Sequence, residues 1–234
     1  MDCEPWDFLW AGQVLRERGT RVVDIPKSLL RFFDREQYAL NFLDGEIRFG
    51  LLEYYRKIEG SRGDDKEGLV DLYWNCRAPQ LIIDKKSRQV VARTQSDQNI
   101  HYSGSSLNRY YILSTSHCEA SVGHLVKKFG RFVVRINDPL ALLERIKAAW
   151  QNHPLALEGS ACIAPVVYNK SGLLEPDPNL IAPVHYSYSQ KATSHEEGKE
   201  FRYVLECRVD AKREWEDFLT LRLCDCRDIC TLSW

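Results

Sequence analysis

Short β-type segments recur along most of the chain, and only a few helical stretches separate them. Each segment either alternates between apolar and polar residues or forms a short apolar run bounded by turn residues, as strands do. Such segments span residues 28–33, 46–50, 70–74, 80–83, 89–93, 109–116, 131–136, 162–168, 184–188 and 200–209. Because strands and helices do not alternate in a βαβ rhythm, the pattern predicts an α+β fold.

Helical stretches are expected over residues 6–18, 34–43, 122–129 and 139–150. The second begins at the capping residue Asp34 and presents Tyr38, Phe42 and Leu43 on one face. No repeat and no Pro/Gly/Ser linker divides the chain. Residues 1–234 are therefore expected to form a single domain, with residues 1–26 as a helical N-terminal extension.

The overall charge limits the classes of partner. Lys and Arg total 32 against 33 Asp and Glu, so the chain lacks the net positive charge that holds a protein non-specifically on nucleic acid or an anionic membrane. The sequence opens acidic, without a charged flank before an apolar run, and no stretch is long enough to span a bilayer. We expect a cytoplasmic protein without a membrane partner, whose eight cysteines are reduced thiols.

The chain lacks the common nucleotide-binding motifs. Neither Gly-x-Gly-x-x-Gly after a strand nor Gly-x-x-x-x-Gly-Lys-Ser/Thr occurs, which disfavours hydride transfer in a Rossmann crevice and NTP hydrolysis on a P-loop. A metal-dependent nuclease built on Asp64, Asp65, Asp84 and Lys86 is an open alternative. The run from Asp84 to Lys86 is more typical of a solvated hairpin turn.

Three cysteines near the C-terminus raise the question of zinc. Cys224 and Cys226 form a Cys-x-Cys pair in a strand-like stretch, and Cys230 follows. No second Cys-x-x-Cys or His pair completes a set of four ligands. The pattern therefore favours small apolar residues on one strand face over a metal site.

Three separated pieces, in chain order, resemble the arginine–serine–glutamate pattern of the ADP-ribosyltransferase superfamily. Arg31 lies on the first core strand, Ser114-Thr115-Ser116 ends a later apolar strand, and Glu200 opens the strand Glu200–Val209. Residues 31–68 also resemble bacterial ADP-ribosyltransferases of phage-defence and toxin–antitoxin loci. The resemblance implies split mixed or antiparallel sheets with flanking helices, NAD consumed as a substrate, and a toxin or defence effector.

The chemistry of NAD cleavage explains why each of these residue types would be needed. Breaking the nicotinamide–ribose bond of NAD passes through an oxocarbenium-like state, which a carboxylate such as Glu200 stabilises. Arg31 suits the adenylate side of the dinucleotide, because a guanidinium presents a planar fork of donors. Ser114 and Ser116 share one strand face and offer hydroxyls to the ribose, while Thr115 points to the other face to pack or to bond the backbone.

The remaining expectations concern the nicotinamide and the acceptor. Tyr54, Tyr55 and Tyr102 are candidates to stack on the cationic nicotinamide ring. Relatives that modify arginine have Gln or Glu two positions before the catalytic glutamate, whereas Gly198 stands here. This departure disfavours a protein-arginine acceptor, and the resemblance favours RNA over DNA or protein and implies a neutralising antitoxin partner. A non-catalytic interaction module with the same fold is the last alternative.

Overall fold

The computed structural model describes residues 25–57, 69–76, 81–83, 90–93, 98–105, 109–117, 122–169, 190–192, 199–207 and 215–233. The expected helix over 6–18 and the expected strand over 184–188 lie outside these ranges. The described elements are helices and a large antiparallel sheet, so the α+β class is confirmed. Among these residues, no helix has the length and apolar character needed to cross a membrane.

The main sheet has eight strands, and every pairing in it is antiparallel. They are β1 (Leu29–Phe33), β2 (Glu46–Leu51), β7 (Arg109–His117), β8 (Phe132–Ile136), β9 (Ala156–Pro165), β12 (Glu200–Cys207), β13 (Phe218–Arg222) and β14 (Cys230–Ser233). One edge of β7 pairs with β12, which in turn pairs with β9. The other edge of β7 pairs with both β1 and β2.

This double pairing leaves a gap in the sheet. β1 meets β7 at the pair Leu30–Ser116, and β2 meets it at the pair Gly50–Ile112. Among the strands that the structure describes, none pairs with residues 113–115 of β7 on that edge. On one side of the gap, β1 pairs with β8, which pairs with β14; on the other side, β2 pairs with β13. The sheet is therefore divided on one side of β7 into two smaller wings.

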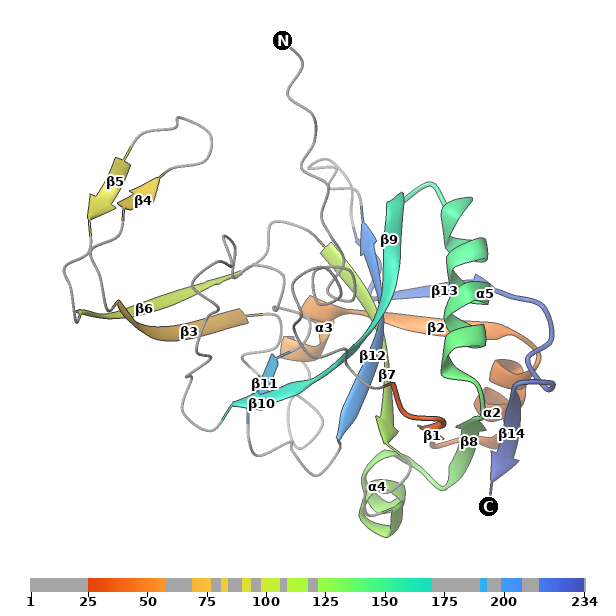
Figure 1. Cartoon of the computed structure of the whole chain (residues 1–234). Coiled ribbons are helices and arrows are strands. Elements are labelled where there is room, and N and C mark those ends of the chain that lie inside the picture. The colour runs from red at the N-terminus through yellow and green to blue at the C-terminus, as the bar shows by residue number, and fades with distance from the viewer. Residues whose placement is uncertain are drawn as a thin grey trace.

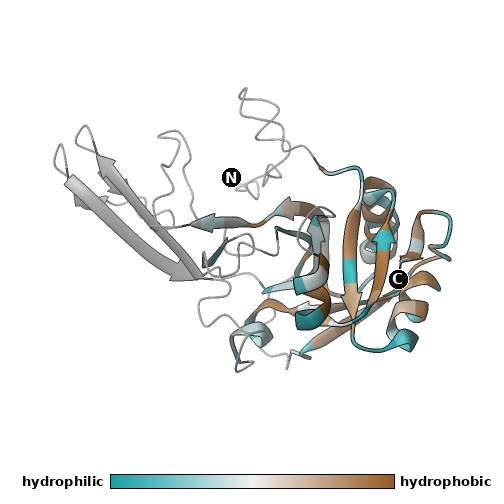
Figure 2. Cartoon of the chain, turned by 90° about the horizontal axis from the view of Figure 1, so that it is seen from below, coloured by the Kyte–Doolittle hydropathy of each residue, from teal (hydrophilic) through white to brown (hydrophobic). Residues whose placement is uncertain are grey.

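Helices cover both faces of the sheet. The main core cluster joins α2 (Glu36–Leu43) and α5 (Pro139–Gln151) to one face, with Trp150 fully buried. α3 (Leu52–Lys57) and α4 (Val122–Phe129) contribute to two smaller clusters with residues of the other face. Figure 1 shows α5 and α3 on opposite sides of the crossing strands. Figure 2 shows hydrophobic colour along these strands and hydrophilic colour on turns and outer helix surfaces.

Three two-stranded ribbons lie outside the main sheet. β3 (Leu69–Cys76) pairs with β6 (Gln98–Ser105), and β4 (Leu81–Ile83) pairs with β5 (Val90–Arg93). Both of these ribbons extend away from the main sheet (Figure 1). The third ribbon joins β10 (Val167–Asn169) to β11 (Gln190–Ala192) in parallel, and it follows directly on β9. The β10–β11 ribbon contacts the candidate site described below.

The expected capping of α2 is wrong in two details. The N-cap is Arg35 rather than Asp34, and no side chain caps the helix. The buried face consists of Ala39, Phe42 and Leu43, whereas Tyr38 is 40% exposed. A helix that buries positions 39, 42 and 43 follows the i, i+3, i+4 spacing, which turns position 38 toward solvent.

Other differences concern element boundaries. The strand β6 is not among the expected strands, because Gln98–Ser105 contains only two large apolar residues, Ile100 and Tyr102, and one β-branched residue. β9 begins at Ala156 rather than at Cys162, and Leu52–Lys57 forms a helix directly after β2. In the two strands, pairing with a neighbouring strand, rather than local pattern, sets the limits of the element.

Two glycines are expected to respond oppositely to alanine. Gly130 has a φ of +126°, and a Cβ there would overlap the backbone of Phe33, so Gly130→Ala should lower the free energy of unfolding by more than about 1 kcal/mol. Gly123 lies in α4 with open space around it, so Gly123→Ala should leave that free energy unchanged or raise it by up to about 1 kcal/mol. Urea denaturation measures both; equal effects would contradict this packing at Gly130.

Candidate functional site

Polar residues replace apolar ones where β7 and β12 run side by side near the gap. Glu200 is paired with Ser116, and Arg202 is paired with Ser114. Directly opposite residues of an antiparallel pair point to the same face of the sheet. The same face continues into the apolar cluster of Ile112 and Val204, two positions further along each strand. We call Ser114, Ser116, Glu200 and Arg202 the polar face.

The serine motif is divided between the two faces of β7. Thr115 is 2% exposed, and its hydroxyl donates a hydrogen bond to the carbonyl oxygen of Phe201 at 2.9 Å. That bond ties β7 to β12 on the side of the sheet opposite Ser114 and Ser116. The expected alternation along the strand is therefore confirmed, and the hydroxyl of Thr115 is engaged with the backbone.

Glu200 has a cation at each carboxylate oxygen. The Nε of Arg202 donates to Oε1 at 2.7 Å, and the Nζ of Lys191 donates to Oε2 at 2.8 Å. The backbone N–H of Glu200 donates to the hydroxyl of Tyr168 at 2.9 Å. Burial alone would raise the pKa of Glu200, but the attraction and hydrogen bonds of Arg202 and Lys191 together hold it well below its usual range. The carboxylate is thus ionised at neutral pH.

Arg202 is the most buried charged side chain of the polar face. It is 0% exposed, and its cross-strand neighbours are Ser114 on β7 and Ala164 on β9. Two small neighbours leave room for a guanidinium inside the sheet layer. A buried cation of this kind is stable only beside an anion, because an unpaired charge in the interior costs several kcal/mol. Glu200 is that anion.

Arg31 reaches across the gap in the sheet. Its Nη1 donates to the carbonyl oxygen of Ser114 at 2.5 Å, and its Nε is buried without a hydrogen-bond partner among the described residues. Burial lowers the pKa of Arg31, whereas the nearby Tyr55 and Glu200 raise it. The guanidinium of Arg31 therefore lies in the same electrostatic environment as the carboxylate, and it keeps an unused donor.

Of the candidate tyrosines, Tyr54 and Tyr55 occupy different positions, and the side chain of Tyr102 lies outside the described part of the chain. Tyr55 packs with the smaller apolar cluster of the site face, and its phenol ring lies so close to Gly50 that a Cβ at Gly50 would overlap it. Tyr54 packs against the main core and, edge to face, against Phe218 at 4.7 Å between ring centroids. Arg48 stacks on Phe218 at 3.5 Å from the ring centroid. Tyr55, rather than Tyr54, interacts with a charge of the site, that of Arg31.

The structure thus brings Arg31, Tyr55, Ser114, Ser116 and Glu200 to one region of the sheet. Among the described residues, Arg202 and Lys191 bind the carboxylate of Glu200, and Arg31 interacts with it electrostatically. Cations of this kind suit an anionic ligand, while the serine hydroxyls and the carboxylate suit a ligand with sugar hydroxyls.

Three partners of Glu200 are not among the candidates that the sequence indicates. Lys191 and Tyr168 are register partners in the parallel β10–β11 ribbon, and both contact Glu200. No local pattern marks a three-residue parallel strand, since its partner is separated from it by a long connection. Arg202 had a signal that went unused: it stands two positions after Glu200, and two positions along a strand share a face.

The nuclease alternative falls on residues that the structure does not describe. Asp64, Asp65, Asp84 and Lys86 all lie outside the described residues. Within those ranges, no group of three His, Cys, Asp or Glu side chains is placed to hold a metal ion.

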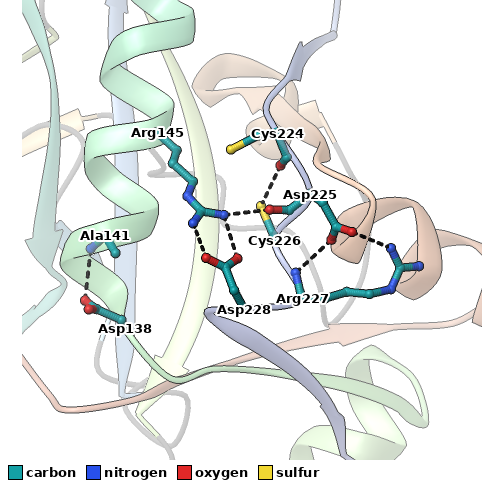
Figure 3. Close-up of polar contacts among 8 residues, drawn as sticks. All are labelled: Asp138, Ala141, Arg145, Cys224, Asp225, Cys226, Arg227 and Asp228. Carbon is teal, nitrogen blue, oxygen red and sulfur yellow. Dashed lines mark hydrogen bonds and ion pairs between the residues drawn. The ribbon is translucent and has the colours of Figure 1, made fainter.

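The C-terminal cysteines lie in and beside a loop rather than along one strand, which corrects the expected strand face. Cys226 belongs to the loop between β13 and β14 and is buried, as is Cys230 at the start of β14, whereas Cys224 is exposed. Cys226 Sγ donates to the carbonyl oxygen of Cys224 at 3.4 Å. Arg145 of α5 holds the loop through the carbonyl oxygen of Asp225, at 2.6 Å, and the carboxylate of Asp228 (Figure 3).

Comparisons with protein-family models, with curated proteins and with solved structures found no significant match.

Replacing Glu200 should destabilise the protein strongly. Glu200→Gln removes the carboxylate charge that binds the buried Arg202, so we expect the free energy of unfolding to fall by about 3–5 kcal/mol at pH 7. Glu144→Gln removes an exposed pair with Lys147 and should cost less than about 1 kcal/mol. Folding lowers the pKa of Glu200. The ionised carboxylate therefore contributes to the free energy of unfolding above its pKa in the unfolded chain, about 4.3, and this contribution is lost as pH falls. The difference between parent and variant should therefore shrink in acid.

The thiols should differ in reactivity. Burial raises the pKa of Cys230 to about 12 and raises that of Cys226, while Cys224 is exposed. Since the thiolate is the reactive form, iodoacetamide at pH 8 should modify Cys224 at least about 100-fold faster than Cys230. Peptide mass spectrometry measures the rates, and urea should abolish the difference. Equal rates in the folded protein would contradict the burial of Cys230.

Proposed function

We propose that this chain is an NAD-dependent mono-ADP-ribosyltransferase, acting as a toxin or defence effector that transfers ADP-ribose from NAD to a macromolecule. One observation carries the proposal: Glu200 lies opposite Ser116 on one face of the sheet, while Arg31 binds the backbone of Ser114 beside them. The pieces that resemble the superfamily are far apart in sequence, and they converge on one surface.

The chemistry of NAD cleavage matches this arrangement. As nicotinamide leaves, the ribose carbon becomes an oxocarbenium-like cation, and an ionised carboxylate lowers the energy of that state. The lowered pKa of Glu200 keeps it ionised at neutral pH. In the proposal, Ser114 and Ser116 hold the ribose hydroxyls, and Glu200 provides the negative charge.

The remaining candidates have roles in binding. Arg31 would contact the adenylate side of NAD through its unused Nε donor, because a guanidinium matches a phosphate with paired hydrogen bonds. Tyr55 would contact the nicotinamide ring. We interpret the division of the sheet at the gap beside β7 as the split sheet of an ADP-ribosyltransferase-like fold.

RNA is the acceptor that we favour. α4 packs against Leu30 and Phe32 of β1, and its last turn carries Lys127 and Lys128, followed by the exposed Arg131. These cations would attract a phosphate backbone toward the region of the polar face despite the balanced total charge. A toxin of this type would also need a neutralising antitoxin protein.

Label transfer from NAD tests the proposal. Purified protein is incubated with NAD labelled in the adenylate and with RNA, DNA or lysate protein. We expect transfer to RNA by the parent, and a loss of at least about 100-fold in Glu200→Gln and in Arg31→Lys. Glu144→Gln and the exposed Arg135→Lys are the matched controls and should retain parental activity. Because Glu200→Gln is less stable, all proteins are assayed well below their melting temperatures.

The outcomes separate the alternatives. Equal transfer by parent and Glu200→Gln would reject the assigned carboxylate. Cleavage of RNA that needs Mg²⁺ and no NAD, and that a chelator stops, would favour the nuclease. A folded parent that neither binds nor cleaves NAD would favour the non-catalytic interaction module.

A further inference from the structure

Glu200 is held by two cations that come from different parts of the fold. Arg202 lies on the same strand and face, and its side chain is 1% exposed. Lys191 lies on β11, outside the main sheet, and its side chain is 15% exposed. The register partner of Lys191 on β10 is Tyr168, whose hydroxyl accepts the backbone N–H of Glu200. Residues of the β10–β11 ribbon therefore bind both the backbone N–H and the side-chain carboxylate of Glu200.

The two hydrogen bonds restrict the carboxylate in two ways. One donor on each oxygen fixes the rotation of the carboxylate plane, since turning it breaks one or both bonds. A carboxylate has about four lone-pair sites, so each oxygen can still accept a second donor, such as a sugar hydroxyl. The cations thus orient the group without filling its capacity to bind.

The two cations also affect the charge state of Glu200. Glu200 is 11% exposed, and a carboxyl group with so little solvent would be neutral more readily than one in water. A protonated glutamate cannot offset a developing sugar cation. Among the described residues, Arg202 on β12, Lys191 on β11 and Tyr168 on β10 bind Glu200, and Lys199 precedes it in the chain. Arg31 on β1 interacts with Glu200 electrostatically, and Tyr55 on α3 and Arg48 on β2 in turn interact with Arg31.

We infer that Arg202 and Lys191 are positioning residues for Glu200: the two cations keep the buried carboxylate ionised and in one orientation. Neither residue needs to touch the substrate for this role. The consequence for catalysis rests on the proposed function, whereas the consequence for the ionisation of Glu200 does not.

Carboxyl titration tests the inference without requiring activity. Protein labelled with ¹³C at the glutamate carboxyl is titrated by NMR, and the Glu200 signal is identified by its absence from Glu200→Gln. In the parent, this signal should stay constant from pH 8 to pH 4. In Lys191→Met/Arg202→Met, burial remains and both cations are gone, so Glu200 should titrate within this range, above its usual value of about 4.3. Lys191→Arg should match the parent, and Lys147→Met is the control for loss of an exposed lysine.

A single variant covers the case in which the double variant does not fold. Lys191 is partly exposed, so Lys191→Met should fold, and its Glu200 signal should begin to move at a higher pH than in the parent. A Glu200 that titrates near its usual value in the parent, or titrations that are identical in the parent and in Lys191→Met, would overturn the inference.

Activity supplies the second readout. The rate of NAD cleavage by the parent should be flat on the acid side, and each variant should lose activity at the pH where its Glu200 carboxyl becomes protonated. If the titrations come out as expected but no protein cleaves NAD, the proposed function fails and the positioning role stands. The opposite outcome is cleavage of NAD with the same dependence of rate on acid pH in the parent, in Lys191→Met and in every other folded variant. In that case the positioning role fails and the proposed function stands.

Discussion

The ion pair between Glu200 and the buried Arg202 sets the chemistry of this surface. A guanidinium enclosed between Ser114 and Ala164 requires an anion within reach, and the carboxylate two residues earlier on the same strand supplies it. One face of β12 is consequently charged at its beginning and apolar further along. On the opposite face, Tyr203 and Leu205 stay in the main core. A polar site is thus built into a central strand without opening the core beneath it.

The gap beside β7 completes the site. Had β1 and β2 formed continuous ladders along this edge, Ser114 would have bonded a neighbouring strand, and Arg31 would have had no carbonyl oxygen to reach. The gap leaves that oxygen to the guanidinium, which is buried and short of one partner. The cost of burying Arg31 in this way is tolerable if a ligand anion completes its hydrogen bonds, which is the physical basis of the proposed NAD site.

Part of this arrangement could be predicted from the sequence. The two-residue period of a strand separated Ser114 and Ser116 from Thr115, and the order of the three motif pieces suggested that Arg31 and Glu200 would meet them. The pairing of Lys191 with Glu200 could not be predicted, since it depends on a short parallel ribbon that no local pattern marks. The cap of α2 was misassigned for a similar reason: Asp34 has the right chemistry for a cap, but the packing of Ala39, Phe42 and Leu43 sets the start of the helix one residue later.

The central claim is that NAD binds where Arg31, the serines of β7 and Glu200 meet. Adding NAD to ¹⁵N-labelled protein and mapping the backbone amide shifts tests this directly, because binding is detected whether or not turnover follows. We expect the largest shifts at Arg31, at residues 114–117 and at residues 200–202. No shift at millimolar NAD, or shifts confined to residues remote from these strands, would contradict it.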